Sequence, residues 1–161
     1  QEGVEALEAF VQAGGTLVTF SEAGDLAIDE FGLPVRNAVS GMWGNEFWSP
    51  GSTLKVEVDT SSPFAHGMPE KALATYLANG QVYETVPGAR SSDVRRVVTY
   101  IDRDILQSGW LLGEAEIANK AAVVSVQHGQ GTVLLIGFRA QHRAQTHGTF
   151  KLLFNALMGH S

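Results

Sequence analysis

The sequence predicts an α/β fold, a three-layer sandwich on a mostly parallel sheet that ends in an antiparallel hairpin. The first thirty residues give the order helix, Gly-Gly, strand, helix, which is typical of α/β sheets. Two apolar, β-rich runs near the end are joined by a short glycine loop, as in a hairpin. An amphipathic pattern at the C-terminus predicts a closing helix.

The N-terminal elements follow from apolar spacing and glycine punctuation. Residues 1–13 carry apolar side chains at helical spacing, and Gly14-Gly15 ends that helix. Residues 16–20 (TLVTF) are apolar enough for a buried parallel strand. Residues 21–31 predict a second helix, which the Gly32-Leu33-Pro34 segment ends.

The rest of the chain alternates between strands and loops. Residues 35–52 hold glycines, two tryptophans and a phenylalanine, which indicates a long functional or interfacial loop. Residues 71–77 fit either a short helix or a strand. The other predicted elements are strands at 53–59, 81–86 and 94–101, a hairpin of 121–127 and 132–138, and a helix at 146–158.

Composition excludes several classes of protein. The chain has 161 residues, of which 44% are hydrophobic and 17% charged, so it is not a disordered tail. No apolar run reaches the roughly 18 residues of a membrane-spanning helix. The net charge of −6 argues against nucleic-acid binding, which needs a clustered basic face. Cysteine is absent, which excludes disulfides, thiolate zinc sites and a cysteine nucleophile.

A single domain, 1–161, is the simplest organisation, with no internal repeat. The apolar period of the first helix begins almost at once, without a capping Ser, Thr, Asp or Asn. We therefore expect the chain to be a C-terminal fragment of a longer one. An incomplete sheet would expose an edge strand, for which a homodimer is one cover.

Ser21 is a weak candidate nucleophile, because it stands between a buried strand and a helix, where hydrolases place theirs. The glycines of a G-x-S-x-G elbow are missing, and a helix N-cap is the simpler interpretation.

The polar stretch 139–147 is the main candidate for ligand binding. Its arginines favour carboxylates or phosphates, and its two histidines do not have the spacing of a known zinc motif. His66 and Glu70 are also one residue away from a zinc H-x-x-E pair, so we expect a turn there and no metal site in this chain. The His128-Gly-Gln-Gly loop joins two strands and is not a phosphate loop. The candidate ligand-binding residues are Arg139, Gln141, His142, Arg143, His147 and, from the aromatic loop, Trp48.

Several stretches together are similar to one protein family over nearly the whole chain. They are EALEAFV (5–11) with GGTLV (14–18), GLPV (32–35), SPGS (49–52), SGWLLG (108–113), and GFRAQHRAQTH (137–147) running into LLFNAL (152–157). They resemble the C-terminal region of bacterial secreted proteins of the zinc carboxypeptidase (carboxypeptidase A-like) family. In these, a peptidase domain precedes a domain similar to class I glutamine amidotransferases.

The resemblance implies a flavodoxin- or amidotransferase-like fold and a secreted or periplasmic location. It places zinc and the catalytic glutamate in the peptidase domain, so none of those residues can be assigned here. Active amidotransferases carry a cysteine near the position of Ser21, and this sequence has none. The implied partner is the peptidase domain of the parent chain.

The expected function is therefore a non-catalytic accessory domain that packs on a secreted zinc metallocarboxypeptidase domain or positions its substrate. On this interpretation the parent is an enzyme, a hydrolase, and this chain by itself is not. Two alternatives remain. One is a small-ligand or anion-binding module that uses Arg139, His142 and Arg143 together with the aromatic loop. The other is an autonomous serine hydrolase that uses Ser21 with a histidine from that stretch.

Overall fold

The computed structural model describes residues 2–88 and 93–159. Its helices are α1 (Glu2–Gln12), α2 (Gly24–Glu30), α3 (Glu114–Ile117) and α4 (Phe150–Met158), with 3-10 turns η1 (Ser21–Ala23), η2 (Pro63–Ala65) and η4 (His147–Thr149). Its strands are β1 (Thr16–Phe20), β2 (Val35–Asn37), β3 (Gly51–Val58), β4 (Lys71–Leu77), β5 (Tyr83–Thr85), β6 (Val94–Tyr100), β7 (Leu106–Gly109), β8 (Ala121–His128) and β9 (Gly131–Ile136).

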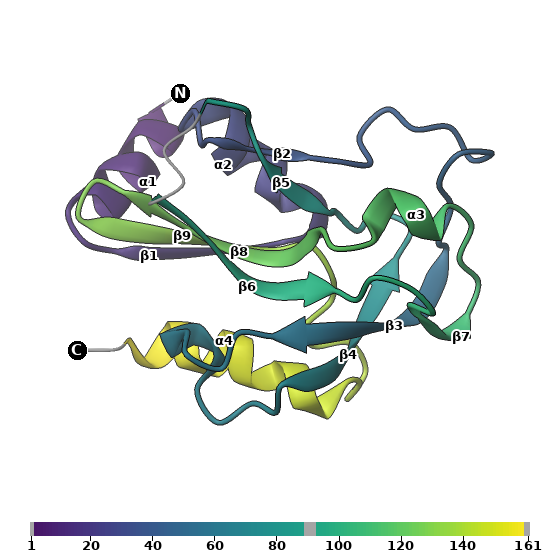
Figure 1. Ribbon diagram of the computed structural model, residues 1–161. Helices are drawn as coiled ribbons and strands as arrows, with labels where there is room; N and C mark the ends of the chain where they lie inside the picture. Colours follow the sequence, from purple (N-terminus) through teal and green to yellow (C-terminus); the bar gives the residue numbers. More distant parts are fainter. Residues whose placement is uncertain (1, 89–92, 160–161) are drawn as a thin grey trace.

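The strands form one open sheet between two helical layers, so the predicted α/β three-layer fold is confirmed. The main path is β1-β9-β8-β6-β3-β4, with β7 on β3, β5 on β8 and β2 on β5. Helices α1 and α2 cover one face, and α4 covers the other (Figure 1). Each face has its own apolar core. Val11, Ala27 and Phe31 belong to the α1–α2 side, and Leu152 and Ala156 of α4 belong to the other.

The prediction that the sheet is mostly parallel is wrong. Within the described strands, β1 and β9 pair in parallel and all other pairings are antiparallel. The apolar run 16–20 predicted a parallel strand, and β1 is indeed parallel to β9. Such runs, however, arise wherever both faces of a strand are covered, whatever its direction. In β8 the first six residues are buried although the strand is antiparallel to its neighbours. The predicted hairpin is confirmed as β8–β9, with His128 paired to Gly131.

The predicted regular elements are confirmed with small shifts of their ends, and residues 71–77 form a strand, β4. The sequence did not indicate β2, β7 or α3, each of which has four residues or fewer. The segment after β2 remains a long loop, residues 38–50, which projects from the sheet (Figure 1). It is fastened to the rest of the protein by two backbone hydrogen bonds between Trp48 and Leu112, with N···O distances of 3.1 and 2.9 Å.

At the β1 end of the sheet, β1 pairs with β9 alone among the described strands, so it is an edge strand. None of the described helices is long and apolar enough to cross a membrane.

Candidate functional site

Ser21 lies at the turn from β1 into η1, as the sequence predicts for a nucleophile-like position. Its φ is +49°, in the left-handed region that non-glycine residues rarely adopt. The prediction that Ser21 caps a helix is wrong, because Phe20 is the N-cap residue and no side chain caps this turn. Strain at a strand-to-helix turn is a property of nucleophile elbows. The backbone is therefore elbow-like even though the G-x-S-x-G glycines are missing.

The Ser21 hydroxyl is nevertheless sealed inside the protein. The residue is 1% exposed, and its Oγ has no hydrogen-bond partner among the described residues. A serine nucleophile needs a base within about 3 Å of its oxygen and an open side for the substrate. Neither is present at Ser21 in the part of the chain that the structure describes. The serine-hydrolase alternative therefore has no geometric support.

Two further buried polar atoms without partners belong to the end of β1 and to the segment that follows β9. Phe20 of β1 stands opposite Ile136 of β9 in a parallel pair, so the segments after these strands leave the sheet side by side. Besides Ser21 Oγ, the buried atoms Thr19 Oγ1 and Arg139 Nε lack hydrogen-bond partners among the described residues. Such atoms carry a desolvation cost. The segments at the carboxyl ends of β1 and β9 thus contain buried groups that lower the stability of the fold.

We expect Ser21→Gly to raise the free energy of unfolding by about 1 kcal/mol. Glycine accepts the positive φ, and the change removes a buried hydroxyl without a partner. Ser21→Ala removes the same hydroxyl but keeps a Cβ at this φ, so it should gain less. Urea unfolding of both variants measures the difference. A Ser21→Gly protein less stable than Ser21→Ala would show that the left-handed backbone carries no strain.

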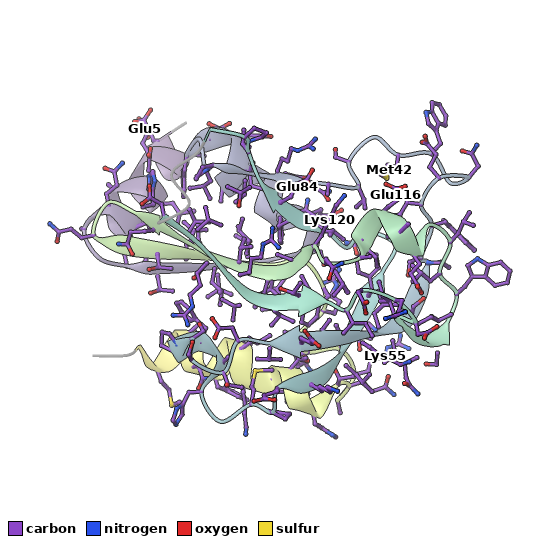
Figure 2. The ribbon with its side chains drawn as sticks, in the orientation of Figure 1. Glu5, Met42, Lys55, Glu84, Glu116 and Lys120 are labelled. Carbon is purple, nitrogen blue, oxygen red and sulfur yellow. The ribbon has the colours of Figure 1, made fainter. Side chains whose placement is uncertain are left out.

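A cavity of about 370 Å³ opens beside this turn, roofed by the 38–50 loop. Its aromatic lining consists of Phe47, Trp48 and Tyr76. Its carboxylates are Glu22 of η1 and Asp25 of α2, and no lysine, arginine or histidine among the described residues lines it. Met42, which also lines it, lies in the projecting loop at the opposite end of the molecule from Glu5 of α1 (Figure 2).

Asp25 is held by a hydrogen-bonded chain that begins in the core. The buried Tyr83 hydroxyl donates to Gln81 Oε1 at 2.9 Å, and Gln81 Nε2 donates to Asp25 Oδ1 at 2.6 Å. Gly24 makes this chain possible, since a Cβ there would lie 2.8 Å from both Gln81 Oε1 and the Tyr83 hydroxyl. This series of hydrogen bonds fixes Asp25 Oδ1 and leaves Asp25 Oδ2 available to a ligand.

The predicted 139–147 site is dispersed in the structure. The backbone N–H groups of His142 and Gln145 each donate to the other residue's carbonyl at 2.8 Å, closing a tight turn. Arg143 stands in this turn with φ +47°, and Gln141 and Arg143 are exposed. Arg139 is half-buried, and its backbone N–H donates to the carbonyl of Thr75 in β4 at 3.0 Å. The two arginines therefore do not line a common cavity among those described.

The other predicted residues also separate. His142 lines a cavity of about 220 Å³ with hydroxyls of β3, β4 and β7, and the exposed His147 ring packs edge-on against Phe150 at 5.3 Å. Trp48 lines the cavity beside Ser21. His66 lies in the predicted turn. The described residues contain no group of three or more His, Asp or Glu side chains placed to hold a metal ion.

Sequence reasoning missed Glu22, Asp25 and Gln81, which with Trp48 line the cavity beside Ser21. The position of Glu22 and Asp25 directly after a strand was the available signal, because ligands bind at strand ends in open α/β sheets. Nothing in the sequence near Gln81 pointed to its place next to Asp25.

No protein-family model matches the sequence, and no curated protein matches it. Solved structures do. A GMP synthase-like protein from Thermoplasma acidophilum matches with a TM-score of 0.57 and 11% identity, over 98% of this chain and 63% of that one. A ThuA-like protein from Parabacteroides merdae matches with a TM-score of 0.56 and 16% identity, over 98% and 64%.

The GH42 beta-galactosidase Gan42B from G. stearothermophilus matches with a TM-score of 0.54 and 17% identity, over 98% of this chain but 19% of the galactosidase. The chain thus spans less than two thirds of each of these proteins. At such identities the likeness shows the fold alone. That fold is glutamine amidotransferase-like, as the sequence resemblance implied.

Proposed function

We propose that this chain is a non-catalytic, amidotransferase-like accessory domain, and that the catalytic domain it serves is a secreted or periplasmic zinc metallocarboxypeptidase. The observation that carries the proposal is the sealed Ser21 hydroxyl. The turn keeps the backbone of a nucleophile elbow, but the side chain has neither access nor a base among the described residues. With no cysteine in the sequence, amidotransferase chemistry has no nucleophile at this turn.

Two further observations support an accessory role. The same fold occupies about a fifth of the length of a beta-galactosidase chain, which is an example of this fold as one unit of a larger enzyme. This chain also exposes aromatic side chains on one region: Trp48 and Trp110 pack edge-on at 6.1 Å and are 46% and 61% exposed. Exposed clusters of this kind mark interaction surfaces.

The first test is an assay of the isolated chain for esterase, glutaminase and carboxypeptidase activity, with zinc analysis by atomic absorption. We expect no turnover above that of the Ser21→Ala variant and no stoichiometric zinc. Turnover that Ser21→Ala abolishes would overturn the proposal in favour of a hydrolase. Zinc at one equivalent would contradict the placement of metal in another domain.

The second test asks for the partner. A zinc carboxypeptidase domain of the resembling family, produced separately, is titrated with this chain in a calorimeter. We expect binding that the Trp48→Ala/Trp110→Ala double variant weakens at least tenfold, because exposed aromatic side chains are frequent hot spots. The matched control is Phe10→Ala on α1, which is 53% exposed and belongs to a different element. Equal loss in both variants would remove the tryptophan surface from the proposal.

A further inference from the structure

We infer that the cavity between Glu22, Asp25 and the aromatic side chains of the 38–50 loop binds an organic cation, a ligand with an ammonium or guanidinium group. This site shares Trp48 with the tryptophan surface described above, but the inference does not depend on the accessory role. Its volume of about 370 Å³ is within the range of small-molecule sites.

The charge of the cavity is the first argument. Glu22 makes no hydrogen bond or ion pair with another described side chain, and Asp25 is bonded only to the uncharged Gln81 among these residues. No described cationic side chain lines the cavity, so two negative charges face it without compensation from its walls. A ligand with a positive group would supply that compensation, and its N–H bonds would meet carboxylate oxygens.

The aromatic lining is the second argument. Trp48, Phe47 and Tyr76 form part of the wall, and aromatic faces attract cations, tryptophan most strongly. Phe47 and Tyr76 pack edge-to-face at 5.9 Å, which holds both rings in place. Tyr76 is itself fixed, because its buried hydroxyl donates to the Gly80 carbonyl at 2.7 Å. A neutral saccharide could stack on these rings but would leave the two carboxylates uncompensated.

Pre-organisation is the third argument. The chain from Tyr83 through Gln81 to Asp25 orients one carboxylate before any ligand arrives. A group held in this way loses little side-chain entropy on binding. The same bond gives the buried Gln81 amide a partner, so one contact both satisfies the fold and holds the Asp25 carboxylate ready for a ligand.

The test is a titration of the protein with butylguanidinium, in which ¹H–¹⁵N NMR monitors the signals of the Trp48 indole N–H and the Gly80 amide N–H. The neutral isostere butylurea is the control ligand. A short peptide, acetyl-Gly-Arg-Gly-amide, tests whether the cation is presented by a polypeptide. We expect saturable shifts with the guanidinium ligands, weaker binding at higher salt, and no saturation with butylurea. A tighter fit of the peptide would identify a peptide side chain as the source of the cation.

The matched variants are Glu22→Gln/Asp25→Asn in the cavity and Glu2→Gln/Glu5→Gln on α1, which change the net charge equally. Both residues of the control pair are exposed, and α1 lies far from the 38–50 loop (Figure 2). We expect the cavity variant to bind about tenfold more weakly and the control less than twofold, with far-UV circular dichroism confirming that both are folded. Four outcomes would each overturn the inference. Two concern the test ligands: neither cation binds saturably, or butylurea binds equally well. The other two are equal effects of the two variants and binding of lactose in place of the cations.

Discussion

Raising the pH from about 10 to about 12 is expected to unfold this protein in one cooperative step, with tyrosine ionisation confined to that step. The chain has three tyrosines, Tyr76, Tyr83 and Tyr100, and all are buried. Burial raises the pKa of each phenol far above its usual value near 10, because the phenolate would lose its hydration. For Tyr83 the nearby Asp25 carboxylate raises the pKa further.

The direction of the effect follows from proton linkage. Above pH 10 the unfolded chain releases three protons that the folded protein retains, so the free energy of unfolding falls as pH rises. The slope for three phenols is about 4 kcal/mol per pH unit. Two such units lower the free energy of unfolding by about 8 kcal/mol, which is enough to unfold a domain in the lower half of the typical range of about 5–15 kcal/mol. Below pH 10 these tyrosines make no pH-dependent contribution.

Absorbance of the phenolate near 295 nm and far-UV circular dichroism, recorded on the same samples, measure this transition. We expect the two signals to change together. The Tyr100→Phe variant should lose about a third of the slope, and at neutral pH it should be somewhat more stable, since the Tyr100 hydroxyl has no partner among the described residues. Phenolate absorbance that rises near pH 10 while the dichroism stays native would contradict the burial of these rings.

Gly137→Ala is expected to lower the free energy of unfolding by at least about 3 kcal/mol. A Cβ on Gly137 would overlap the backbone carbonyl oxygen of Gln81. The carbonyl of Gly137 accepts a hydrogen bond from Gln81 N–H at 2.7 Å, so the two backbones cannot separate without losing it. Urea denaturation of the wild type and the variant measures the loss.

Gly3→Ala is the matched control for this prediction. Gly3 lies on the exposed side of α1 with nothing within 4 Å of an added Cβ, and alanine is the better helix former. We expect it to be neutral or slightly stabilising. A Gly137→Ala protein as stable as wild type would mean that the segment around Gln81 moves freely, and the cavity beside Ser21 would then have a flexible floor.

The elements of this fold could be predicted from the sequence because their signals are local. Gly14-Gly15 and the apolar run 16–20 suffice to place α1 and β1. Strand direction could not be predicted in the same way, because it depends on which strands meet across long stretches of chain. The antiparallel hairpin of 121–127 with 132–138 could be predicted because its glycine loop is local, and it is confirmed as β8–β9. The antiparallel pairing of β8 with β6 could not, because the two strands are distant in the chain.

The candidate site likewise has residues that local sequence signals could predict and one that they could not. Ser21 and Arg139 each follow an apolar strand in the sequence, and the structure brings those strands together as β1 and β9. The carboxylates that line the neighbouring cavity, Glu22 and Asp25, could also have been predicted as site residues, because they closely follow Ser21 at the end of a strand. Gln81 was not, since it lies 56 residues from Asp25 in the chain and is recognised only by its hydrogen bond to that residue.

The separation of the aromatic residues has a consequence for the spectroscopy of this protein. Its three tryptophans, Trp43, Trp48 and Trp110, are 77%, 46% and 61% exposed, whereas its three tyrosines are buried. Indole emission depends on contact with water, and that contact already exists in the native state. Tryptophan fluorescence should therefore change little on unfolding and strongly when a ligand or partner covers this face. In this protein, the indoles report on binding and the phenols report on folding.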